Sequence, residues 1–242
     1  MAGMTWVSDL REQVEAAYDG LGLPSWPDPH AGLPTTAQEE YSRVTDPERY
    51  RIVHARAQVW VDSLAAVPGV QVERLAPAPL GDGTTRRFDR GVRIFPPRPD
   101  ALPLLLLEED APVSGGAGSL AVLSIGVARP EIRLELVPDC GCDACDFGSD
   151  DLLEAIDGTI GNVVDGPLVV LRGDSWRAWW HPEGGASEST ESTESTEDTD
   201  GADSRGRPDH RLLMESSRRI AAGESVRLPE GTEVLVGRSW FG

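Results

Sequence analysis

Lysine is absent from this 242-residue sequence, so all 22 of its basic residues are arginines. They are outnumbered by 41 acidic residues, which gives a formal net charge of -19 and an isoelectric point near 4.5. Because phosphate backbones repel a strongly acidic surface, the composition argues against a nucleic-acid partner. The same surplus of acidic residues suits a basic macromolecular partner.

Long hydrophobic runs are absent as well. The four leucines at 104–107 extend to seven apolar residues only when 101–103 are counted with them, whereas a membrane-spanning helix needs about 20. The beginning of the sequence lacks the basic and apolar regions of a secretory signal. We therefore expect no membrane-spanning segment and a cytoplasmic location.

Cysteine is scarce, and its three copies all fall between positions 140 and 145. An odd number of cysteines in one short segment is a poor framework for disulfides, which are also rare in reducing compartments. The clustering instead favours a metal-binding or redox-active group of thiols.

The rest of the chain contains a clear succession of periodic segments. Apolar residues at helical spacing predict helices over 5–21, 47–67, 150–162 and 209–222, with Asp46 and Ser149 at the N-cap positions of the second and third. Alternation and short apolar runs predict strands over 70–75, 85–95, 104–107, 120–127 and 131–137. Two hairpins are predicted after them, one joining 168–171 to 176–180 and the last joining 225–228 to 233–240.

An acidic tract at 183–209 interrupts this pattern. It repeats the triplet Ser-Thr-Glu and contains no aliphatic residue larger than alanine, which predicts a disordered insertion. We expect a single α+β domain formed by 1–182 and 210–242, with N-terminal helices, one central helix and a largely antiparallel sheet. The disordered acidic loop at 183–209 would interrupt that domain.

The segment 138–146 carries the main chemical motif, Pro-Asp-Cys-Gly-Cys-Asp-Ala-Cys-Asp. Its C-x-C-x-x-C spacing brings three thiolate ligands, Cys140, Cys142 and Cys145, into one tight loop. Zinc takes four ligands in tetrahedral array, at about 2.0 to 2.3 Å, and the flanking aspartates favour a divalent cation. We predict a zinc site formed by the three cysteines, with Asp146 as a candidate fourth ligand.

Several alternatives remain open at this loop. The other candidates for the fourth ligand are the four histidines, His30, His54, His181 and His210. His181 is expected at the far end of the 150–162 helix from the cysteines, and His54 borders an apolar helical face that is typical of a core. The thiols are also compatible with a redox or nucleophilic role, which a helix N-terminus favours and neighbouring aspartates disfavour, or with no function.

Four segments resemble an uncharacterised actinobacterial family of unknown function. They are 41–50, the cysteine loop at 138–146, the tryptophan-rich Trp-Arg-Ala-Trp-Trp-His at 176–181 and the closing Gly-Arg-Ser-Trp-Phe at 237–241. The resemblance covers nearly the whole chain outside the acidic tract. It implies a cytoplasmic bacterial protein and carries over no catalytic residue.

Two functional hypotheses follow from the sequence. The first is a non-enzymatic binding or regulatory module whose fold is stabilised by zinc at Cys140, Cys142 and Cys145, with a macromolecular partner. The second is a metal- or thiol-dependent enzyme that uses the same loop, with His54 or an aspartate as base and Trp179 or Trp180 lining a pocket. The first is preferred because no set of acid and base residues accompanies the cysteines.

Overall fold

The computed structural model describes residues 3–32, 35–81, 85–113, 118–189 and 209–241. Its helices are α1 (Gly3–Asp19), α2 (Ile52–Ala65), α3 (Ser149–Asp165) and α4 (His210–Ala221), with 3-10 turns η1 (Gln38–Glu40), η2 (Pro47–Arg51) and η3 (Asp143–Cys145). Together with antiparallel sheets, these helices confirm the predicted α+β class. No helix within the described ranges is long and apolar enough to cross a membrane.

The larger sheet has five strands in the order β1-β4-β5-β6-β7, and every neighbouring pair is antiparallel. These strands are β1 (Gln71–Leu75), β4 (Arg90–Phe95), β5 (Leu104–Pro112), β6 (Ser119–Val127) and β7 (Arg133–Val137). The predicted strand at 85–95 is divided at Asp89. Its first part, β3 (Arg87–Phe88), pairs with β2 (Ala78–Pro79) in a small separate hairpin.

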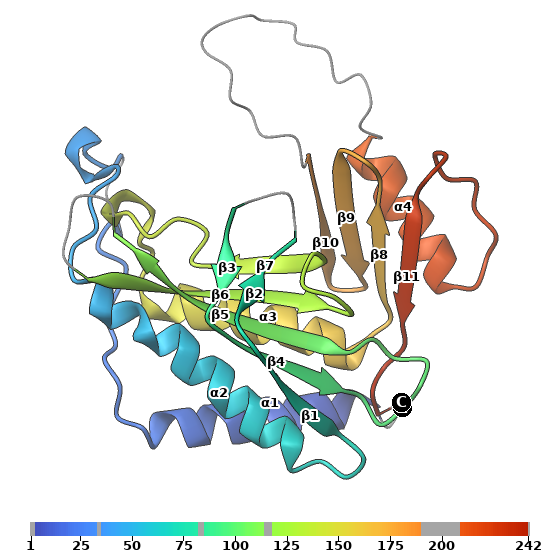
Figure 1. Ribbon diagram of the computed structural model, residues 1–242, viewed down its shortest axis with the longest axis horizontal. Coiled ribbons are helices and arrows are strands. Elements are labelled where there is room, and N and C mark those ends of the chain that lie inside the picture. The colour runs from blue at the N-terminus through green and yellow to red at the C-terminus, as the bar shows by residue number, and fades with distance from the viewer. Residues whose placement is uncertain (1–2, 33–34, 82–84, 114–117, 190–208, 242) are drawn as a thin grey trace, which may run out of the picture.

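The helices α1, α2 and α3 lie together on one side of the larger sheet, and the β2–β3 hairpin lies near its other side (Figure 1). Leu104 and Leu106 belong to the main core with the helices, whereas Leu105 and Leu107 pack against the small hairpin. Burial on both faces explains why β5 begins with a continuous run of leucines rather than an alternating pattern.

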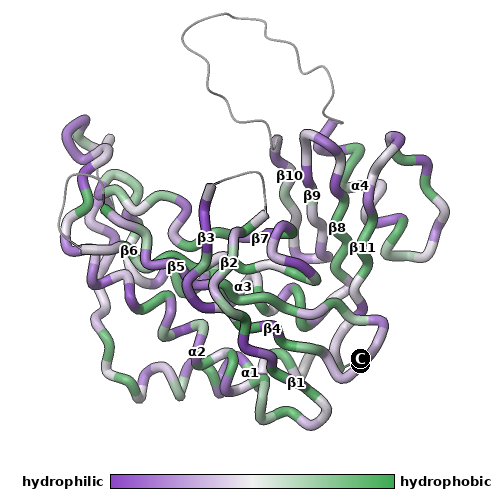
Figure 2. The backbone as a smooth tube through the Cα atoms, viewed as in Figure 1, coloured by the Kyte–Doolittle hydropathy of each residue, from purple (hydrophilic) through white to green (hydrophobic). Residues whose placement is uncertain are grey.

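The second sheet has four antiparallel strands in the order β10-β9-β8-β11. They are β8 (Leu168–Arg172), β9 (Trp176–His181), β10 (Gly184–Ser189) and β11 (Glu233–Gly237). Figure 2 shows β8 and β11 largely in the colour of hydrophobic residues. One face of this sheet packs against Leu213 and Ala221 of α4, and the predicted hairpin of 168–171 with 176–180 is confirmed as β8–β9.

An arginine connects the two sheets. The guanidinium of Arg129, which follows β6, donates two parallel hydrogen bonds of 2.9 and 2.8 Å to the carboxylate of Glu233 in β11. It also donates to Glu131 at 2.6 Å. The main core continues across this junction, because Leu168, Val170 and Trp240 belong to the same cluster as the larger sheet.

Two strand predictions in the C-terminal half are wrong. The last hairpin does not form, because β11 pairs with β8, and Leu228 packs against the α4 cluster instead. Residues 184–189 were predicted to be disordered but form β10, which pairs with β9. Backbone hydrogen bonds along β9 hold this strand without large apolar side chains. The remainder of the predicted insertion, 190–208, lies outside the described residues.

Asp46 holds the predicted N-cap position, but of the 3-10 turn η2 that leads into α2. It has a positive φ of 51° and makes no capping bond with its side chain. The predicted cap of α3 is wrong. At α3 the N-cap position is held by Gly148, and the hydroxyl of Ser149 donates to the carbonyl of Trp26 at 3.1 Å. This hydrogen bond attaches the start of α3 to the loop at 25–30, which lies beside the cysteines.

Candidate metal centre

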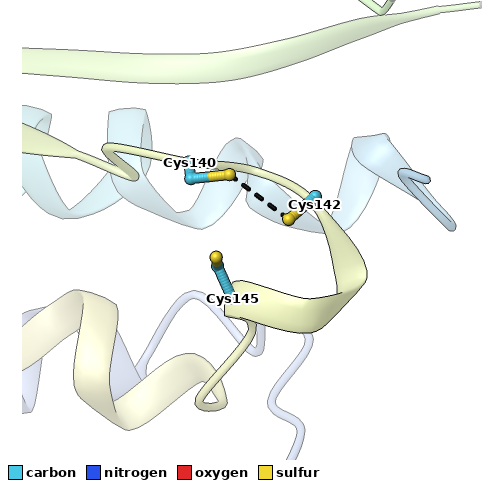
Figure 3. Close-up of side chains that lie close together, drawn as sticks. All are labelled: Cys140, Cys142 and Cys145. Carbon is cyan, nitrogen blue, oxygen red and sulfur yellow. Dashed lines mark hydrogen bonds between the residues drawn. The ribbon is translucent and has the colours of Figure 1, made fainter. Parts of the chain in front are cut away.

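The three cysteines converge at the turn that joins β7 to α3. Their Sγ atoms all lie within 4.8 Å of one another, and the Sγ atoms of Cys140 and Cys142 are 3.3 Å apart. Figure 3 shows Cys140 and Cys142 on the extended part of the loop, with Cys145 pointing back toward them from η3. Tetrahedral ligands about 2.3 Å from one ion lie about 3.8 Å apart, so small movements are enough to bring all three sulfurs onto one metal ion.

Leu120 packs over the backbone between the first two cysteines. A Cβ added to Gly141 would meet Cδ2 of Leu120 at 2.2 Å, so a side chain at this position would have to displace the end of the Leu120 side chain. After Cys142 the chain turns into η3, where the amide of Cys145 donates to the carbonyl of Cys142 at 2.9 Å. The turn brings the third thiol back toward the first two.

Asp143 anchors the loop to the 43–45 segment. Its carboxylate accepts hydrogen bonds of 2.6 Å from Arg43 and of 2.7 Å from both the amide and the hydroxyl of Thr45. Its own amide donates to the carbonyl of Arg43 at 2.7 Å. Burial opposes the charged carboxylate, but these hydrogen bonds outweigh it and lower the pKa of Asp143. Asp143 therefore fixes the loop rather than offering a free ligand.

Asp146, the predicted fourth ligand, does not belong to the group of converging ligand atoms. Its carboxylate is 97% buried and binds elsewhere. It accepts hydrogen bonds from Arg49 at 2.5 Å, from the indole of Trp26 at 3.0 Å and from the amide of Gly148 at 2.9 Å. Both oxygens of this carboxylate are already engaged by these partners, so as a metal ligand Asp146 stays a prediction, one that these contacts do not favour.

None of the four histidines belongs to the cysteine group within the described residues. His30 is close to the loop, with its Nδ1 3.1 Å from the carbonyl oxygen of Asp146 and its Nε2 3.4 Å from a carboxylate oxygen of Glu40. His54 contacts the carbonyl of Val122, and His210 contacts the hydroxyl of Ser187. Within the described ranges, the ligand atoms that converge are therefore three thiols, with no fourth side-chain ligand atom among them.

His181 lies at the other end of α3, as expected, where Asp165 and Gly166 influence its titration. Its side chain is buried, and Nδ1 accepts from the amide of Glu183 at 3.2 Å. Burial lowers the pKa of His181, against the opposing influence of Asp165 and Glu183 and with a further contribution from Arg11.

This environment predicts a dependence of stability on pH. Because the pKa of His181 is lower in the folded state, the unfolded state binds more protons as the pH falls through its ordinary pKa of about 6.5. The free energy of unfolding is therefore expected to fall as the pH is lowered from 7.5 to 5.5, and His181→Gln is expected to reduce that fall. Urea unfolding at both pH values measures the effect. The exposed His210→Gln is the matched control, and equal pH dependence in both variants would contradict the assignment.

The three thiols differ in exposure and in ionisation. Cys140 is exposed, Cys145 is half-buried and Cys142 is buried. Burial disfavours the Cys142 thiolate, but hydrogen bonds from the Cys140 thiol and from the amide of Ser42 outweigh it and lower the pKa of Cys142. The hydrogen bond with Cys142, together with burial, raises the pKa of Cys145 to about 12. Neighbouring thiolates repel one another, and a bound cation would relieve that repulsion.

The cleft lined by Trp179 is separate from the cysteine loop. It lies between the start of β7 and the strands β8, β9 and β10, and its walls are formed by 131–134, Val170, Arg172, 177–179 and 186–188. None of these residues belongs to the loop at 138–148. The predicted pairing of a tryptophan pocket with the cysteines is therefore not found there.

Sequence reasoning missed the residues that support the loop from a distance. Trp26 and Arg49 bind the Asp146 carboxylate, and the Arg49 guanidinium lies 4.7 Å from the Trp26 ring centroid. Ser42 donates its amide to Cys142 and has a positive φ of 65°. Two of the three, Ser42 and Arg49, belong to the 41–50 segment, which sequence analysis singled out for its resemblance without assigning it to the cysteines.

Comparison with known proteins identifies a family but no activity. A family model matches residues 12–241, nearly the whole chain, and it describes a family of unknown function, DUF6226. No curated protein and no solved structure matches the chain. All four segments that carried the resemblance lie within the matched range.

Proposed function

We propose that this chain, which belongs to the family of unknown function DUF6226, binds one zinc ion through Cys140, Cys142 and Cys145. The convergence of three Sγ atoms within 4.8 Å carries the proposal. Thiolates are preferred zinc ligands, and a single ion neutralises charges that otherwise repel one another. The fourth ligand is a water molecule or a group from another molecule.

The position of the loop supports a role for zinc in stability. The cysteines lie between Asp143, which binds the 43–45 segment, and Asp146, which binds Trp26 and Arg49. A metal ion at the three sulfurs would join both ends of the loop, and with them the start of α3, to the N-terminal segments. Binding to the folded state alone stabilises it by mass action.

We infer from these features a cytoplasmic binding or regulatory module of actinobacterial origin, with a basic macromolecular partner. The net charge of -19 supports a basic partner and opposes nucleic acid. Three unpaired cysteines suit a reducing compartment. Among the described residues, no histidine or carboxylate joins the cysteine group as an acid or base, which supports binding rather than catalysis.

One observation favours a metal-dependent enzyme as the second candidate. Cys140 is exposed, and the described residues provide only three ligand atoms. Catalytic zinc sites characteristically use three protein ligands and keep one position open for water or substrate. The two candidates therefore share the metal site and differ in whether that open position takes part in a reaction.

Measurement of the metal content tests the zinc site that both candidates share. The zinc-loaded protein is expected to contain one zinc per chain by elemental mass spectrometry, and Cys142→Ser is expected to lose it. The matched control is Asp174→Asn in the exposed β8–β9 turn, which should retain the full metal content. Equal zinc content in the wild type and Cys142→Ser would contradict the proposed ligands.

Thermal unfolding tests whether the folded state binds the metal. At zinc concentrations about 1,000 times the dissociation constant, binding is worth about 4 kcal/mol. That corresponds to roughly 8 to 16 °C in Tm for a domain of this size. Because mass action does not depend on what the metal does, both candidates predict loss of this increment with a chelator and in Cys142→Ser. Loss of zinc with an unchanged Tm would contradict binding to the folded state alone.

A further inference from the structure

We propose that Cys140 and Cys142 form a disulfide when the protein meets hydrogen peroxide, and that this reaction releases the metal ion. The disulfide rests on the geometry of the two thiols alone, whereas metal release rests on the proposed zinc site. The loop is thus a modification site whose substrate is a hydroperoxide. The regulated property is the occupancy of the metal site.

The distance between the two sulfurs favours this pairing. They are 3.3 Å apart, and a disulfide bond is about 2.05 Å long, so the bond forms after a closure of about 1.3 Å. Figure 3 shows the two side chains pointing toward each other from the same stretch of loop. Only Gly141 separates them, and no second segment of the chain has to move into place.

Exposure sets the order in which the thiols react. Cys140 is exposed and open to a small oxidant in solution, whereas Cys142 is buried. Reactive cysteines that sense oxidants are accessible and often lie beside a second, resolving cysteine. The exposed sulfur of Cys140 is therefore the one that peroxide attacks, and the neighbouring sulfur of Cys142 is the one that resolves the product.

The chemistry balances with one peroxide for each disulfide. The Cys140 thiolate attacks one peroxide oxygen, the O–O bond breaks, and a sulfenic acid and hydroxide result. The Cys142 thiolate then attacks the Cys140 sulfur, forming the S–S bond and expelling a second hydroxide. The two hydroxides take up the two thiol protons as water, and the two cysteines supply the two electrons that reduce the peroxide.

Oxidation would leave the metal with a single thiolate ligand. Two of its three protein ligands would be joined in the disulfide, which does not coordinate zinc as two thiolates do. Cys145 would remain as an unoxidised thiol. Reduction by a cellular dithiol would restore all three ligands, so the modification is reversible.

The test uses the full chain in metal-free and zinc-loaded forms, each treated with hydrogen peroxide. Peptide mass spectrometry without reduction is expected to find a Cys140–Cys142 disulfide in both forms. A chromophoric chelator is expected to detect one zinc released per disulfide from the loaded form. Cys145→Ser should still form the disulfide, whereas Cys140→Ser should lose it.

The two forms separate this inference from the proposed zinc site. If the protein binds no zinc, the metal-free sample still shows whether the disulfide forms. Its formation would then support the proposed disulfide, whereas the proposed metal release would fail together with the zinc site. A Cys142–Cys145 disulfide, or overoxidation of Cys140 with no disulfide, would overturn the proposed pairing. A disulfide that forms in the loaded protein while zinc stays bound would overturn the proposed release.

Discussion

The substitution Arg56→Ala is expected to reduce the free energy of unfolding by about 3 to 5 kcal/mol, because it breaks a buried ion pair by removing one partner. Arg56 is 99% buried in α2. Its guanidinium binds Asp157 in α3 and donates to Glu15 in α1 at 2.5 Å, so one side chain joins three helices. The indole of Trp60 donates to the same Asp157 carboxylate at 2.7 Å.

Urea unfolding followed by circular dichroism measures this effect. The variant should unfold at a lower urea concentration, because the half-buried Asp157 carboxylate loses its guanidinium partner. Arg51→Ala is the matched control, because Arg51 is exposed and forms an ion pair with the exposed Glu48. Exposed pairs contribute about 0 to 1 kcal/mol, so a similar small loss in Arg56→Ala would show that the three-helix network is not a main source of stability.

The substitution Asp146→Ala is expected to reduce the free energy of unfolding by about 3 kcal/mol. It removes a buried carboxylate that accepts from Arg49, Trp26 and the amide of Gly148. Arg49 and the start of α3 would lose their common anchor. Since Asp146 is not one of the converging ligands, the variant should still bind one zinc per chain when zinc is saturating.

The matched control for Asp146→Ala is Asp150→Ala. Asp150→Ala alters an exposed carboxylate in the first turn of α3, where interaction with the helix dipole is worth about 0.3 to 1 kcal/mol. Denaturant unfolding and metal analysis are run on both variants. Complete loss of zinc from a folded Asp146→Ala protein would restore Asp146 as a ligand and contradict the position of its carboxylate.

Local sequence patterns predicted those elements whose signals are themselves local. The alternation before Val137 predicted β7, and the turn around Gly173 and Asp174 predicted the β8–β9 hairpin. The partner of β11 could not be predicted in this way, because β8 lies about 60 residues earlier in the chain. Strand pairing over such a distance depends on the packing and burial of side chains rather than on local sequence. The polar strand β10 likewise depends on β9 for its hydrogen bonds and carries no apolar pattern of its own.

The same division applies to the candidate site. Spacing alone indicated that Cys140, Cys142 and Cys145 converge, because all three fall within six consecutive residues. The role of Asp146 depended on Arg49 and Trp26, which lie about a hundred residues away in the sequence. The local sequence beside a cysteine does not indicate which distant cation a carboxylate binds, so the contacts of Asp146 could not be predicted.

X-ray absorption at the zinc edge of the zinc-loaded protein tests the central claim most directly. The account predicts three sulfur ligands at about 2.3 Å and one lighter ligand, oxygen or nitrogen, at about 2.0 to 2.2 Å. The three sulfurs correspond to the cysteines that converge between β7 and α3. A first shell of oxygen and nitrogen alone would contradict the account, because it would place the zinc away from Cys140, Cys142 and Cys145.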